Sequence, residues 1–67
     1  MAVARITEIS AASPTSFDDA ARQGIARATE TLKNVQSAWI KDSEVTVKNG
    51  EIDEYRVHMK VTFVLED

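Results

Sequence analysis

The sequence contains no cysteine, so neither a disulfide nor a thiolate zinc site stabilises the fold. Its single histidine is too few for a metal site built from histidines. No apolar run approaches the roughly 20 residues of a membrane span, and a net charge of -3 offers no basic surface to nucleic acid. The first residues also lack the features of a signal peptide. These absences predict a cytoplasmic protein that binds neither membranes nor nucleic acid.

The short length of the chain limits what its core can do. The 67 residues form one domain, over residues 1–67. A domain near this size buries only about 60% of its unfolded surface, so one core gives marginal stability. Disulfides, a structural metal or oligomerisation are the usual remedies. Without cysteine, oligomerisation is the remedy left, and we expect a homo-oligomer.

The first half of the chain predicts a strand and a helix. Residues 3 to 10 are short, β-branched and mixed in polarity, as in a strand, and residues 11 to 15 form a loop. Over residues 16 to 34, apolar side chains recur at spacings of three and four, which is typical of an α-helix. That stripe consists of Phe17, Ala21, Gly24, Ile25, Ala28 and Leu32. Ser13 or Ser16 is expected to cap its start, and Asp19 completes a variant capping box with Ser16.

The second half predicts a hairpin of two strands. Residues 36 to 47 form one strand, and Asn49-Gly50 tolerates the positive φ angles of a tight two-residue turn. Over residues 52 to 66, apolar and polar side chains alternate with a period of two. The last strand is much longer than the helix, so it must overhang the helix or curl around it. We therefore expect an α+β fold of order β-α-β-β, with a three-stranded antiparallel sheet partly wrapped around one helix. We expect the apolar odd positions of the last strand to face the helix and its even positions to face a neighbouring copy or a cage interior.

Several short segments, at ungapped spacings from about residue 3 to residue 66, give this chain a family resemblance. They are Ser13, Ser16-Phe17, Ala26-Arg27-Ala28, Asn34-Val35, Tyr55-Arg56-Val57 and Phe63-Val64-Leu65-Glu66-Asp67. In this set the sequence resembles the dodecins, small proteins that assemble as hollow homododecamers and typically bind flavins. The resemblance implies a non-catalytic subunit that holds riboflavin or FMN between copies.

The resemblance also implies positions for the flavin site. Dodecins stack the flavin ring on a tryptophan early in the second strand and contact its polar edge with a glutamine near the start of the third. The ungapped match places Ser37 and Arg56 at these two positions. Both departures weaken the flavin assignment and make the sequence more similar to the branch that lacks this tryptophan, one member of which binds calcium. Trp39, two residues beyond Ser37 on the same strand face, is an alternative stacking surface or a packing residue at a subunit contact.

Two further groups of polar residues have a functional and a plain interpretation. Asp42 and Glu44 form an oxygen-rich stretch, which is part of a Ca²⁺ or Mg²⁺ site completed by a neighbour, or a solvated bend. Arg56, His58 and Lys60 share one strand face, as a patch for a phosphate or carboxylate ligand or as partners of nearby acidic residues. No nucleophile or carboxylate accompanies His58 in a catalytic motif, so we expect no enzyme. The sequence predicts ligand binding and storage; the alternative is an assembly that binds divalent cations or is purely structural.

Overall fold

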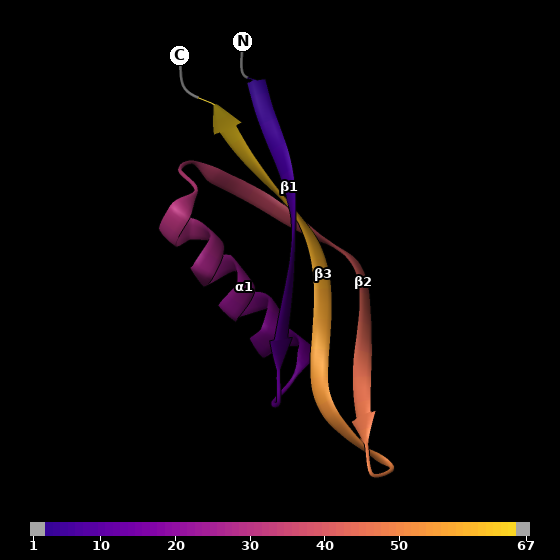
Figure 1. Cartoon of the computed structure of the whole chain (residues 1–67). Helices are drawn as coiled ribbons and strands as arrows, with labels where there is room; N and C mark the ends of the chain where they lie inside the picture. Colours follow the sequence, from indigo (N-terminus) through magenta and orange to yellow (C-terminus); the bar gives the residue numbers. More distant parts are fainter. Residues whose placement is uncertain (1–2, 66–67) are drawn as a thin grey trace.

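The chain folds into one helix and three strands in the order β-α-β-β, as predicted (Figure 1). A computed structural model describes residues 3–65. Strand β1 spans Val3–Ser13, helix α1 Phe17–Thr31, strand β2 Val35–Lys48 and strand β3 Glu51–Leu65. The predicted end of the last strand at Glu66 lies outside the described residues.

The three strands form one antiparallel sheet in the order β1-β3-β2, so the last strand lies in the centre. Val3 is opposite Leu65 at one end of the β1–β3 pair, and Ser13 is opposite Tyr55 at the other. The turn between β2 and β3 is the predicted one, with φ of 55° at Asn49 and 78° at Gly50. Positive φ at both central residues matches the right-handed twist of the strands that the turn joins.

Helix α1 packs on β1 and β3 with a face made of small side chains. Ser16 caps its start, because its hydroxyl accepts a hydrogen bond of 3.0 Å from the backbone N–H of Asp19. Ala20, Gly24 and Ala28 are buried in the contact, and Val57 and Met59 form the core opposite them. At Gly24 a Cβ atom would lie only 2.6 Å from Cε of Met59, so the glycine permits the close approach. Burial of Val57, Met59 and Val61 confirms that odd positions of β3 face the helix.

Two predicted boundaries and the predicted capping box differ from the structure. The expected loop at residues 11 to 15 is strand up to Ser13, because β1 continues its pairing with β3. The helix ends at Thr31 rather than at residue 34, since Leu32 is extended and Asn34 has a φ of 60°. Asn34 then bonds to β3, where its carbonyl accepts from the N–H of Val64 at 3.1 Å. The capping box is incomplete: the Asp19 carboxylate accepts hydrogen bonds from Ser13 and Gln23.

The sheet is too long for one helix to cover, as the predicted lengths of the last strand and the helix indicated. The molecule measures 51 × 19 × 13 Å, and the end of the β2–β3 hairpin extends past α1 (Figure 1). Its accessible surface is 4962 Å², against about 4200 Å² expected for a folded monomer of this mass. Many large apolar side chains are therefore exposed. They are Val3, Ile6, Phe17, Trp39, Ile40, Val45, Val47, Ile52 and Leu65.

Candidate functional site

A bulge in β2 decides which of its side chains share a face. Trp39 is opposite Lys60 and Ile40 is opposite Met59, but the next paired residue is Asp42, opposite His58. Lys41 is the extra residue, and β2 bends midway along its length, as Figure 1 shows. Without the bulge, strict alternation would point Trp39 and Asp42 to opposite faces. The bulge instead places them on the same face.

All five predicted site residues lie on the face of the sheet that α1 does not cover. Residues directly opposite one another in antiparallel strands point to the same side, and the even positions of β3 point away from the helix. We call this side the helix-free face. It carries Ser37, Trp39, Asp42 and Glu44 from β2, opposite Thr62, Lys60, His58 and Arg56 from β3. The structure thus brings together residues that the sequence assigned to two separate kinds of site.

Trp39 is the centre of one half of the helix-free face. Its side chain is 49% exposed, and Nζ of Lys60 lies over its ring, 5.3 Å from the centroid. The same Nζ is 3.7 Å from Oε1 of Glu8 on β1, and Nζ of Lys41 is also 3.7 Å from that oxygen. Two ammonium groups therefore share one carboxylate beside a half-exposed indole ring.

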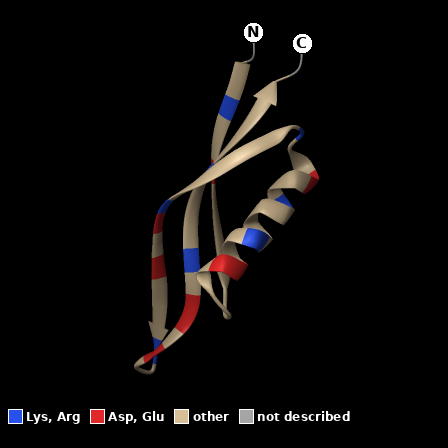
Figure 2. Cartoon of the chain, turned by 180° about the vertical axis from the view of Figure 1, so that it is seen from behind, with Lys and Arg blue, Asp and Glu red and all other residues tan. Residues whose placement is uncertain are grey.

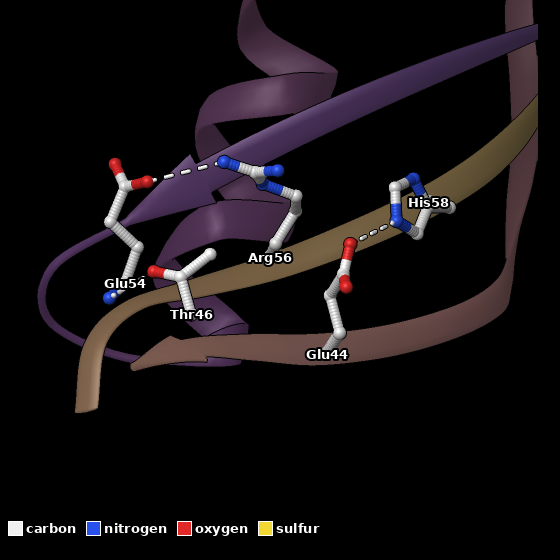
Figure 3. A network of polar contacts seen from close by, with 5 residues as sticks. All are labelled: Glu44, Thr46, Glu54, Arg56 and His58. Atoms are coloured by element: carbon white, nitrogen blue, oxygen red, sulfur yellow. Dashed lines mark hydrogen bonds and ion pairs between the residues drawn. The ribbon is translucent and has the colours of Figure 1, made fainter. Parts of the chain in front are cut away.

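Asp42 and Glu44 lie in the other half, where both approach His58. Nε2 of His58 donates a hydrogen bond of 3.0 Å to Oε1 of Glu44 (Figure 3). The same Nε2 lies 3.7 Å from Oδ1 of Asp42. Within residues 3–65, no group of three or more His, Cys, Asp or Glu side chains has an arrangement that holds a metal ion.

The cationic residues of β3 are paired with acidic residues of the same chain. Arg56 contacts Oε1 of Glu54 at 3.3 Å, while His58 contacts Glu44 (Figure 3). Beside them, the hydroxyl of Thr46 accepts a hydrogen bond of 3.1 Å from the backbone N–H of Glu54. Such half-exposed ion pairs contribute about 0–1 kcal/mol each, so they set the charge pattern more than the stability. This pairing supports the plain interpretation of Arg56 as part of a polar face.

A shallow groove crosses the helix-free face next to Trp39. Trp39 is not among its lining residues. Its polar lining comes from all three strands and consists of Glu8, Ser10, Lys41, Asp42, Ser43, Glu44 and His58. Basic and acidic residues are interspersed along β2 and β3, with no stripe of one sign (Figure 2). The groove is therefore suited to a small ligand with separate polar groups rather than to a polyanion.

Sequence reasoning missed Glu8 and Lys41 as members of this site. Glu8 is 52 residues from Lys60 in the chain, and only the β1–β3 register makes them neighbours. Lys41 shares Trp39's side under strict alternation, but its ion pair with Glu8 on β1 depends on the order of the strands in the sheet. The two faces of the last strand were predictable from its alternation, but its pairing with β1 was not.

Comparisons with known proteins agree with this fold over nearly the whole chain. A family model described as Dodecin matches residues 3–66. The dodecin of Streptomyces davaonensis is 35% identical, with a TM-score of 0.94 over 98% of this chain and 97% of that one. A tryptophan-to-phenylalanine mutant of the T. thermophilus dodecin is 27% identical, with a TM-score of 0.94 over 100% of both chains.

A third structure bears on the cation question. The calcium dodecin of Mycobacterium tuberculosis is 28% identical, with a TM-score of 0.84 over 96% of this chain and 91% of that one. Among curated proteins, none matches the sequence. Within residues 3–65, no helix is long and apolar enough to cross a membrane. The full-length family match and the shared β-α-β-β topology show that the chain belongs to the dodecin family.

Proposed function

We propose that the chain is a non-catalytic subunit of a homo-oligomeric cage that stores a small planar ligand, a flavin such as riboflavin or FMN, between copies. Trp39 is the observation that carries this proposal. A half-exposed indole beside a polar groove offers a flat stacking surface for a ring. Membership of a family of ligand-binding cage proteins supports it. A cytoplasmic location and the lack of catalysis stay predictions.

Self-association is the part of this proposal that the exposed surface supports. Within residues 3–65, five apolar residues are buried in the lone chain, namely Ala20, Ala28, Val57, Met59 and Val61, whereas nine large ones are exposed. So many exposed large apolar side chains on so small a domain are typical of a chain that forms interfaces. Free edges on β1 and β2 also need covering. Copies of the same chain meet both needs, and the number twelve follows from the family alone.

A fluorescence titration tests the ligand. Protein is titrated into riboflavin and into FMN, and flavin emission is followed. We expect quenching that saturates below one ligand per subunit, because the ligand lies between copies and stacks on Trp39. Trp39→Ala should abolish the quenching, whereas Ile6→Ala, another exposed apolar residue of the helix-free face, should retain it. Unchanged emission at micromolar wild-type protein would refute a flavin role.

The position of Ser37 gives the proposal a second, independent test. We infer that this chain belongs to the branch of dodecins without the usual flavin tryptophan, because the ungapped match puts Ser37 there. Ser37 lies opposite Thr62 on the helix-free face, two residues before Trp39 in β2. Ser37→Trp should therefore create or strengthen flavin quenching, whereas Ser43→Trp, opposite Val57 on the helix side, should not. No gain with Ser37→Trp would mean that the inferred correspondence is wrong.

Cation binding is a second candidate function, carried by the convergence of Asp42 and Glu44 on His58. A related protein is named calcium dodecin, which supports Ca²⁺ or Mg²⁺ as the ion. Calcium takes six to eight oxygen ligands, so carboxylates from a second copy would have to complete the site. Calorimetric titration with CaCl₂ and MgCl₂ tests this. Heat of binding that is lost in Asp42→Asn but kept in Asp53→Asn would support the site, and its absence in wild type would exclude it.

A further inference from the structure

We propose that Lys60, together with Lys41 and Glu8, gives the Trp39 surface a preference for planar ligands that carry an anionic group such as a phosphate or a carboxylate. This inference rests on the proposed ligand site at Trp39 and names the chemical class of ligand that the site takes. It concerns residues that the proposed flavin and cation sites leave unused.

The three residues Glu8, Lys60 and Trp39 form a row across the sheet. In register, Lys60 is opposite Glu8 on one side and opposite Trp39 on the other. Nζ of Lys60 is 5.3 Å from the indole centroid and 3.7 Å from Oε1 of Glu8. The Lys60 side chain is only 33% exposed, so its ammonium is held beside the ring rather than free in solvent. A ring that stacks on this face of Trp39 would displace the ammonium from over the indole to the edge of the stacked pair, where it stays close to the ligand.

The charge of this row is not balanced. Lys41 also lies 3.7 Å from Oε1 of Glu8, so two ammonium groups face a single carboxylate. Among residues 3–65, these ion pairs leave one of the two positive charges uncompensated next to Trp39. Ammonium groups bind phosphate and carboxylate oxygens through charge-assisted hydrogen bonds. An anionic group on a ligand that stacks on Trp39 could therefore bind to these ammonium groups.

The other half of the helix-free face has the opposite character. There Asp42 and Glu44 face one imidazole, that of His58, so carboxylates outnumber basic groups. An anionic group would be repelled at that end of the groove and attracted at the end that holds Lys41 and Lys60. The bulge at Lys41 separates the two halves. The face therefore sets the direction in which an anionic ligand lies, as well as its affinity.

A merely structural role for Lys60 would give a different result. Cross-strand ion pairs and a cation–π contact also stabilise a sheet, and their loss lowers stability without regard to any ligand. A preference between two ligands that share a ring and differ in charge reports only on the ligand site. Riboflavin and FMN are such a pair, because FMN adds a phosphate group to the same ring and side chain.

The experiment measures dissociation constants for riboflavin and FMN by flavin fluorescence at low salt. Wild-type protein should bind FMN about 3- to 10-fold more tightly, the size of one partly exposed charge-assisted contact. Lys60→Met should bring the ratio of the two dissociation constants to about one, mainly through weaker binding of FMN. Lys48→Met, which removes the same charge near the β2–β3 turn, should keep the preference. Added salt, to about 0.5 M, should reduce the wild-type ratio as well.

Glu8→Gln provides a test of opposite sign. It frees both ammonium groups, so the FMN preference should rise above that of wild type. Equal affinity of wild type for the two flavins, or a preference that survives in Lys60→Met, would overturn this inference and leave the stacking site intact. If wild type binds neither flavin, both the proposed flavin function and this inference about ligand charge are wrong. An unchanged circular dichroism spectrum of each variant shows that the fold is retained.

Discussion

Replacement of Ile40 by aspartate tests whether the uncovered helix-side surface of β2 is a contact between copies. Ile40 is opposite Met59, so it points to the side of the sheet that carries α1. The helix packs on β1 and β3, however, and Ile40 stays 54% exposed. In a lone chain, a substitution at such a position changes the free energy of unfolding by less than about 1 kcal/mol.

The effect on assembly should be much larger. Full burial of an isoleucine side chain contributes about 1.5–3 kcal/mol, and roughly half of this surface is still exposed in the single chain. Loss of that contact costs about 1 kcal/mol per copy, and desolvation of the new carboxylate adds a few kcal/mol more. Because each copy of a closed assembly carries the same defect, these costs add over all contacts. Ile40→Asp should therefore dissociate the assembly at micromolar concentration.

Size-exclusion chromatography with light scattering measures the result, and circular dichroism checks the fold. Ile40→Asp should elute as a smaller species with an unchanged spectrum, whereas Ile40→Val should keep the wild-type mass. Gln36→Asp adds the same charge at an exposed polar position of β2 and should also assemble normally. If Ile40→Asp has the same mass as wild type, β2 does not form the contact, and the interface must involve other exposed residues.

Three further predictions concern local structure and are read from thermal or urea unfolding. Ser16→Ala removes the hydroxyl that caps α1 and should cost about 1 kcal/mol; an unchanged midpoint would mean that the cap contributes nothing. Gly50→Ala forces a side chain into a φ of 78° and should cost about 1 kcal/mol, whereas Asn49→Gly should be nearly neutral. Gly24→Val places atoms within 3.0 Å of Ala11 and closer still to Met59, so a loss of about 2 kcal/mol or more is expected, and normal stability would contradict the close packing.

Much of the fold follows from short-range patterns that the sequence displays. The alternation in residues 52 to 66 predicted the central strand and the burial of Val57, Met59 and Val61. Asn49-Gly50 predicted the turn, because few other residue pairs tolerate its φ angles. The packing face of the helix was harder to predict from the sequence. Ala20 is fully buried but was absent from the predicted apolar stripe, because a single alanine carries little hydrophobic signal.

The candidate site depended on longer-range relations. The sequence named Ser37, Trp39, Asp42, Glu44 and Arg56, but as members of separate flavin and cation sites. Their position on one face required the register of β2 against β3. The prediction that even positions of β3 face away from the helix agrees with the structure, and what covers them in an assembly stays a prediction.

The sequence by itself determined the elements, the turn and the helix cap, because each depends on residues within a few positions of one another. Only the tertiary structure decided the strand order, the bulge at Lys41 and the Glu8–Lys60 contact. These depend on which strand pairs with β3 and in which register. A shift of one residue in register moves a side chain to the opposite face of a sheet, so a single bulge determines the composition of the site.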